Sequence, residues 1–120
     1  MKTLKLESVV SNLNLELISG NELSEKIVEG AYVSDLLSDV MGNAKRNDIW
    51  LSMQSHTNII AVASLREISA IVITGKSKVE EKTIQKAKEE SVVILKSHKP
   101  TFETAGEIYE ILKKNKHVSI

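Results

Sequence analysis

The sequence has no cysteine, a single proline and few aromatic side chains, which make up 3% of its 120 residues. The absence of cysteine excludes disulfides, thiolate metal sites and iron–sulfur clusters. No apolar run approaches the roughly 18–20 residues that cross a bilayer, and the first residues carry no signal-peptide apolar stretch. We therefore expect a cytoplasmic protein with no membrane contact, whose core is built from valine, isoleucine, leucine and alanine.

Neither sign of charge is in excess over the whole chain, because 16 basic side chains balance 16 acidic ones. Residues 1–60 hold 5 basic and 8 acidic side chains, a net −3, and residues 61–120 hold 11 and 8, a net +3. A nucleic-acid-binding protein typically neutralises about 6–10 phosphates, whereas the extra lysines here are interleaved with glutamates. We expect no nucleic-acid partner. The length and the 42% hydrophobic content indicate one domain over residues 1–120.

Short apolar segments alternate along the chain with segments of helical periodicity. The predicted strands are Leu15–Ile18, Ile27–Val33, Ile49–Met53, Ala70–Thr74 and Val92–Leu95. Helices are predicted over Leu6–Leu13, from Ser34 to Ala44, over Thr57–Ile68, after a capping box at Ser77–Glu80, and after Pro100. This alternation indicates an α/β fold, a three-layer α/β/α arrangement with a mostly parallel sheet of about five strands.

The pattern also predicts which side chains face the core or end a helix. Ser34 is expected to cap the second helix, with Asp35 in its first turn, and Gly30 to mark a bulge or a close contact. The inward residues are predicted to be Leu36, Leu37, Val40, Met41 and Ala44 in the second helix, and Phe102, Ala105, Tyr109 and Leu112 in the last. Residues 117–120 are expected to form a loose tail.

Polar side chains follow three of the predicted strands at the point where each strand ends. They are Gln54, Ser55, His56, Thr57 and Asn58 after the third strand, Thr74, Gly75 and Lys76 after the fourth, and His98 after the fifth. Since the carboxyl ends of parallel strands lie at one edge of the sheet, we expect these residues to share one rim. Helix amino ends at such a rim favour anions, so the nine residues form the candidate ligand-binding site.

Each of these residues also has a structural interpretation. Ser55 and Thr57 suit helix capping, Gln54 and Asn58 could tie the turn to a neighbouring loop, and Gly75 supplies a positive φ. His56 could switch charge near neutral pH, since the ordinary pKa of histidine is about 6.5. Lys76 could neutralise a phosphate or simply be solvated. His56 and His98 lack a third ligand, and we expect neither a metal nor a cofactor.

The run Trp50–Leu65, the segment Ile71–Gly75 and the amphipathic helix after it resemble the DRTGG domain, and Tyr32–Met41 is similar to small stand-alone members of that family. Ser55-His56-Thr57 stands in place of the naming Asp-Arg-Thr, and Gly75-Lys76 in place of Gly-Gly. Gln54, His56 and Asn58 match the Gln-x-His-x-Asn version of stand-alone members. The resemblance covers almost the whole chain. It implies a fold similar to the N-terminal domain of HPr kinase/phosphorylase.

The DRTGG domain also occurs as a segment of long phosphotransacetylases and of pyrophosphatases that carry CBS domains. It is regarded as regulatory and tends to dimerise, so the resemblance implies a regulatory module and a homodimer. The first functional hypothesis is accordingly a non-catalytic regulatory or sensor module that binds a small anionic ligand, such as a phosphate compound or a nucleotide, at the rim.

The alternative hypothesis is an adaptor or assembly subunit that acts through protein–protein contacts. Helix Thr57–Ile68 would pack against a copy of itself or another protein, with Ala61, Ala63 and Ser64 permitting close approach. Some stand-alone relatives look like companions of redox or hydrogenase systems. An enzyme is the least favoured class, because the chain has neither a G-x-x-x-x-G-K-[ST] loop nor a G-x-G-x-x-G turn, and no nucleophile–base set can be read from it.

Overall fold

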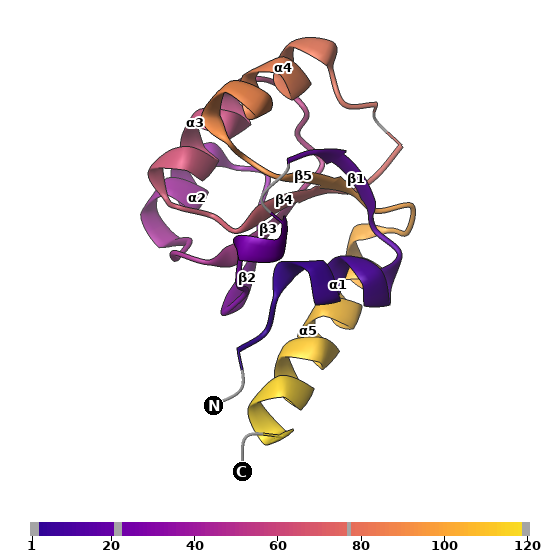
Figure 1. Ribbon diagram of the computed structural model, residues 1–120. Coiled ribbons are helices and arrows are strands. Elements are labelled where there is room, and N and C mark those ends of the chain that lie inside the picture. The colour runs from indigo at the N-terminus through magenta and orange to yellow at the C-terminus, as the bar shows by residue number, and fades with distance from the viewer. Residues whose placement is uncertain (1–2, 21–22, 77, 119–120) are drawn as a thin grey trace.

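A five-stranded sheet forms the middle layer of the structure, a computed structural model that describes residues 3–20, 23–76 and 78–118 (Figure 1). Its strands are β1 (Glu16–Ser19), β2 (Gly30–Val33), β3 (Asp48–Ser52), β4 (Ala70–Ile73) and β5 (Ile94–Lys96). They lie in the order β1-β5-β4-β3-β2, with β2 to β5 parallel and β1 antiparallel to β5. The prediction of a mostly parallel sheet of five strands is confirmed.

Helices cover both faces of this sheet. α2 (Leu37–Asn43), α3 (Asn58–Leu65) and α4 (Glu81–Glu90) lie on one face, and α1 (Leu6–Leu13) and α5 (Thr101–Val118) on the other (Figure 1). The strands β2 to β5 follow one another in space as they do in sequence, so their three connecting helices fall on the same side. A short 3-10 helix, η1 (Leu23–Glu25), contacts α1. Among the described residues, no helix is both long and apolar enough to cross a membrane.

The sheet divides the core into two halves. Trp50, Ile71 and Ile73 belong to the half under α2, α3 and α4, whereas Leu51 and Val72 belong to the half under α1 and α5. All five side chains have no exposed surface. Because successive side chains of a strand point to opposite faces, a strand covered on both sides must be apolar throughout. That requirement explains the continuous apolar runs from which β3 and β4 were predicted.

The second helix begins later than predicted. α2 starts at Leu37 and no side chain caps it, because the Ser34 hydroxyl instead accepts a hydrogen bond from the Leu36 amide in the preceding loop (3.1 Å). The predictions that Ser34 caps this helix and that Asp35 lies in its first turn are therefore wrong. Leu36 and Met41 are exposed rather than inward. A helix of seven residues presents only a narrow inner face, which Val40 fills.

The predicted inward face of the last helix is wrong at two of its four positions. Phe102 and Tyr109 are 87% and 63% exposed, while Thr104 and Ile108 are buried. The helix is rotated from the predicted face because Thr104 points inward, where its Oγ1 bonds the Ser97 hydroxyl (2.7 Å) and the Pro100 carbonyl (3.0 Å). The prediction of a loose tail is also wrong for residues 117 and 118, because α5 continues to Val118. Residues 119–120 lie outside the described part of the chain.

The capping box before the fourth helix is not formed as predicted. Glu80 is itself the N-cap residue of α4, and no side chain caps this helix. Ser77 lies outside the described residues. The Glu80 carboxylate contacts His56 instead of an amide of its own helix. Val79 and Ala87 are buried on the inner side of this segment. Gly30 makes the expected close contact, since a Cβ there would lie 2.7 Å from Asp48 Oδ1.

Gly20, directly after β1, is a position where any side chain should be costly. Its φ is +126°, and an added Cβ would lie 2.8 Å from Val93 Cγ2 and 3.1 Å from Val93 Cα. We expect Gly20→Ala to lower the free energy of unfolding by about 2–4 kcal/mol, because backbone strain and overpacking add. Urea unfolding followed by tryptophan fluorescence measures the change. In Gly42→Ala the new Cβ meets nothing within 4 Å, so an equal loss in both variants would contradict this explanation.

Candidate functional site

The carboxyl ends of β2, β3, β4 and β5 lie at one edge of the sheet, since these four strands are parallel. The segments that follow them share one rim, as the sequence predicted. Glu16 joins this rim from β1, because the antiparallel register sets it opposite Lys96. The strand order does not reverse between β2 and β5, so no crevice opens between diverging connections. Any hollow on the rim must be shaped by loops and side chains.

The turn after β3 is tied to its neighbours through Gln54 and Ser55. The Gln54 amide donates to Ser52 Oγ (3.0 Å), and its side-chain Nε2 donates to the Asp35 carbonyl (3.1 Å). The Ser55 carbonyl accepts a hydrogen bond from Thr83 Oγ1 of α4 (2.6 Å). These contacts match the structural interpretation of Gln54, and they join the turn to the loop before α2 and to helix α4.

His56, Thr57 and Asn58 are exposed at the start of α3. His56 Nδ1 lies 2.8 Å from Glu80 Oε2, with the two side chains 68% and 44% exposed. Thr57 is the N-cap residue of α3, but no side chain caps this helix, so the capping interpretation of Ser55 and Thr57 is wrong. The three side chains are accessible at the rim, and a carboxylate orients the imidazole.

Asp35 organises this part of the rim, a role that the sequence interpretation missed. Its Oδ1 accepts hydrogen bonds from Ser52 Oγ (2.7 Å) and from the Met53 amide (2.8 Å). The carboxylate therefore joins the loop after β2 to the turn after β3. Its position in the sequence could have indicated this role, because Asp35 follows a strand just as the other candidate residues do.

Removing the Asp35 carboxylate should loosen the turn after β3. We expect Asp35→Ala to lower the free energy of unfolding by about 1–3 kcal/mol, since hydrogen bonds to charged groups contribute on that scale. The Met53 and Gln54 amides should exchange with deuterium about tenfold faster, as local opening becomes easier. Asp35→Asn keeps an acceptor oxygen but loses the charge, so both effects should be present and smaller. Unchanged exchange in Asp35→Ala would contradict the organising role.

A second group of rim residues surrounds a hollow of about 520 Å³ bounded by β1, the start of α4 and the ends of β4 and β5. We call it the Lys76 hollow and define it by Gly75, Lys76, Lys78, Lys96 and His98, which line it. Gly75 has a φ of +84°, the positive value predicted for this turn. An apolar wall completes the hollow, formed by Ile18, Val79 and Ile84.

Positive charge exceeds negative charge in this hollow. The three lysines face two carboxylates, Glu16 and Glu81, before His98 is counted. Burial lowers the pKa of Lys96, and nearby Glu16 opposes that effect. Lys96 Nζ donates to the Gly75 carbonyl, and His98 Nε2 lies 2.8 Å from Glu16 Oε1. Lys96, which was not among the nine candidate residues, is therefore a partly buried cation in the lining of this hollow.

A smaller hollow of about 420 Å³ adjoins the Lys76 hollow. It shares Gly75, Lys76 and His98 and adds Met53, Lys99, Pro100 and Thr101. Of the nine predicted site residues, these shared three meet around hollows, while Gln54 to Asn58 gather beside α3 and α4. Thr74 is buried, with its Oγ1 2.6 Å from Thr101 Oγ1. It ties β4 to α5 without reaching the surface.

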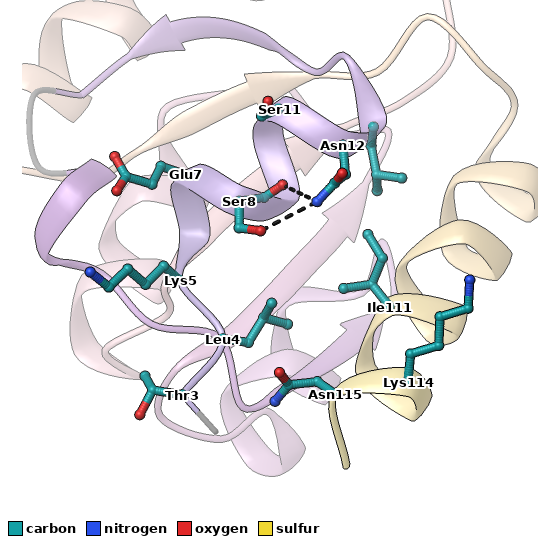
Figure 2. A pocket seen from close by; sticks show the side chains of 11 residues that line it. Thr3, Leu4, Lys5, Glu7, Ser8, Ser11, Asn12, Ile111, Lys114 and Asn115 are labelled. Atoms are coloured by element: carbon teal, nitrogen blue, oxygen red, sulfur yellow. Dashed lines mark hydrogen bonds between the residues drawn. The ribbon is translucent and has the colours of Figure 1, made fainter. Parts of the chain in front are cut away.

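A larger hollow, of about 1020 Å³, lies between α1 and α5 (Figure 2). Leu4 and Ile111 contribute apolar atoms to it, and Asn12 Nδ2 donates to the carbonyl and hydroxyl oxygens of Ser8. None of the nine predicted site residues lines this hollow. Within the described parts of the chain, no group of three or more histidine and acidic side chains could hold a metal ion.

Comparison with solved structures finds this fold in the regulatory region of a pyrophosphatase from Clostridium perfringens, a crystal structure of CBS and DRTGG domains complexed with the activator diadenosine tetraphosphate. The match covers 87% of this chain and 45% of that one, with a TM-score of 0.70 and 19% sequence identity. The chain thus spans less than half of the structure it matches. No curated protein sequence is significantly similar to it. The sequence model of the DRTGG domain matches residues 8–111, and the chain therefore belongs to the DRTGG domain family.

Proposed function

We propose that this chain is a regulatory module without catalytic activity of its own, which binds a small anionic ligand in the Lys76 hollow. The observation that carries the proposal is the convergence of Lys76, Lys78, Lys96 and His98 on one hollow at the carboxyl edge of the sheet. A cation held in a partly water-excluded position interacts more strongly with an anion than a solvated one does. Lys96 provides such a cation.

A nucleotide is the ligand class that best suits both walls of this hollow. The lysines can pair with phosphate oxygens, and Ile18, Val79 and Ile84 offer apolar surface for a ring. Binding sites for small molecules commonly combine a mostly apolar lining with a few placed polar groups. The similar pyrophosphatase regulatory region, which was complexed with a dinucleotide activator, supports this choice for a chain of the same fold.

The hydrogen bonding of the rim hydroxyls supports a role in binding rather than in catalysis. Thr74 bonds Thr101, Ser97 bonds Thr104, and Ser52 bonds Asp35, so these hydroxyls are occupied in joining elements. The two rim histidines contact Glu80 and Glu16, respectively. A nucleophile needs a base within hydrogen-bond reach. Among these pairings only the Ser52 hydroxyl meets one, the Asp35 carboxylate, and Ser52 is buried where a substrate would not reach it.

Calorimetric titration of the intact chain tests the proposal. The panel is inorganic phosphate, AMP, ATP, NAD and diadenosine tetraphosphate, and we expect at least one nucleotide to bind more tightly than about 1 mM. The charge variant Lys76→Met should weaken that binding. Lys114→Met removes the same charge beside the α1–α5 hollow and should not. Absence of binding across the panel would contradict the proposal.

An adaptor role through α3 is the second candidate, and Leu65 is the feature that favours it. Leu65 is 70% exposed near the end of α3, next to the exposed Ala61 and Ser64. Ala63, expected on the contact surface, is buried in the core. The outer face of α3 is therefore less apolar than the sequence suggested. A partner that binds wild type and Leu65→Ser equally well would count against α3 as its contact.

A further inference from the structure

One wall of the Lys76 hollow is also a wall of the smaller hollow beside it, because Gly75, Lys76 and His98 line both. We call the smaller one the Met53 hollow and define it by its lining residues, Met53, Gly75, Lys76, His98, Lys99, Pro100 and Thr101. The two hollows measure about 520 and 420 Å³, and sites for small molecules span about 300–1,000 Å³. A nucleotide ring in the Lys76 hollow therefore leaves the Met53 hollow unfilled.

The two hollows extend toward opposite faces of the sheet. The Lys76 hollow reaches Ile84 of α4, and the Met53 hollow reaches Thr101, the first residue of α5. α4 and α5 cover different faces of the sheet (Figure 1). The shared wall comes from the turns after β4 and β5, between these two helices. A ligand that occupied both hollows would therefore cross the edge of the sheet over the ends of β4 and β5.

Positive charge is centred on this shared wall. Lys76 belongs to it, and Lys96 Nζ donates to the carbonyl of Gly75, another of its residues. Farther into the Met53 hollow the charge of Lys99 is compensated, since its Nζ lies 2.6 Å from Glu107 Oε2. The amino ends of α4 and α5 lie on either side of the wall and favour negative charge. Phosphate groups are therefore expected at the shared wall rather than deep in either hollow.

The far side of the Met53 hollow suits a flat ring. Met53 is 52% exposed, and its side chain lies against Gly75, where an added Cβ would be 3.4 Å from Met53 Cγ and Sδ. A thioether adapts its shape and makes favourable contacts with aromatic rings. Pro100 adds apolar surface. The shared cationic wall thus has an apolar surface on each side, formed by Met53 and Pro100 in one hollow and by Ile18, Val79 and Ile84 in the other.

We propose that the ligand is a dinucleotide, with its phosphate chain on the shared wall and one nucleoside in each hollow. This inference rests on the proposed function, since it takes the Lys76 hollow as the site of the phosphates and the first ring. Joining two binding groups makes the second contact intramolecular, which raises affinity without further ordering of separate molecules. A mononucleotide fills one hollow and forgoes that gain.

Calorimetric titration of the full chain with adenosine 5′-tetraphosphate and with diadenosine tetraphosphate tests the inference. Both ligands contain one adenosine on a chain of four phosphates, and only the second has another adenosine at the far end. The mononucleotide carries more negative charge, so attraction to the lysines alone would favour it. We expect diadenosine tetraphosphate to bind about tenfold to a hundredfold more tightly.

The variant Met53→Ser removes the apolar surface of the second hollow. It should bring the affinity for diadenosine tetraphosphate down to about that for adenosine tetraphosphate, and leave the latter unchanged. The backbone hydrogen bond from the Met53 amide to Asp35 is kept. Met41→Ser makes the same change on α2, at a residue that lines neither hollow, and should leave both affinities unchanged. Far-UV circular dichroism checks the fold of each variant.

Backbone amide shifts locate the second ring, because the amides of Thr101 and Phe102 should move with diadenosine tetraphosphate and not with adenosine tetraphosphate. If diadenosine tetraphosphate binds no more tightly than adenosine tetraphosphate, the inference is overturned while the proposed function stands. The same holds if Met53→Ser weakens both ligands equally. If neither ligand binds, the proposed function fails and this inference fails with it.

Discussion

Replacing Trp50 with alanine is expected to lower the free energy of unfolding by about 3–5 kcal/mol, the range for removing a large buried aromatic side chain. Trp50 has no exposed surface, and its Nε1 donates to the Ser34 carbonyl (2.9 Å). The variant therefore leaves a cavity and an unpaired carbonyl. Small domains are stable by only about 5–15 kcal/mol, so this loss is a large fraction of the chain's stability.

Urea unfolding followed by far-UV circular dichroism measures this effect, because the substitution removes the only tryptophan. Trp50→Phe keeps a ring but loses the hydrogen bond to Ser34, so its free energy of unfolding should fall less than that of Trp50→Ala. Trp50→Ala should also loosen the rim, since the Trp50 indole bonds the carbonyl of Ser34, the residue before Asp35. A loss below about 1 kcal/mol for Trp50→Ala would show that the α2 half of the core is not packed as described.

Substituting Lys96 by methionine is expected to separate binding from stability. Methionine keeps the length of the side chain and removes a cation that burial disfavours. Affinity for the best nucleotide should fall about tenfold to a hundredfold, as expected for the loss of a charge-assisted contact. The free energy of unfolding at pH 7 should be equal to that of wild type or greater. If Lys96 had a purely structural role, its substitution would instead lower stability and leave the affinity unchanged.

The direction of the pKa shift of Lys96 gives this prediction a pH dependence. Burial lowers the pKa of Lys96 in the folded chain below its ordinary 10.5. At a pH where Lys96 is charged in both the folded and the unfolded chain, its burial lowers the free energy of unfolding. This penalty disappears as the pH rises from the folded pKa toward 10.5. Wild type should gain stability relative to Lys96→Met over that interval. If Lys96→Met binds nucleotide normally, or is strongly destabilised at pH 7, Lys96 is not a binding cation.

The parts of the fold that the sequence predicted best are those with the strongest periodic signal. The apolar runs of β3 and β4 have one physical explanation, burial on both faces, so their existence, parallel direction and shared rim could be predicted. The inward face of α5 could not, because Phe102, Ala105, Tyr109 and Leu112 show helical spacing whether a stripe faces the core or a partner. The inward turn of Thr104 depends on Ser97, a tertiary contact that no local pattern contains.

The candidate site was predictable in position but not in composition. Gly75, Lys76 and His98 were found because each follows a strand, and parallel strands end together. Lys96, the last residue of β5, lies on the same rim but was not one of the nine candidates, because its partial burial beside β1 is a tertiary contact that no local pattern contains. Asp35 was assigned to a helix that begins two residues later, since a serine followed by an acidic residue resembles a helix start. Its bonds to Ser52 and Met53 depend on the pairing of β2 with β3.

Mapping of backbone amide chemical shifts during titration with ATP or diadenosine tetraphosphate tests the central claim most directly, because it locates a ligand on the intact chain. The claim is that anions bind among the lysines at the carboxyl edge of the sheet. We predict shifts at Gly75, Lys76, Lys96 and His98, with the amides of Ser8 and Asn12 in the α1–α5 hollow unmoved. Shifts confined to Ser8, Asn12 and their neighbours, with Gly75 and Lys76 unmoved, would contradict it.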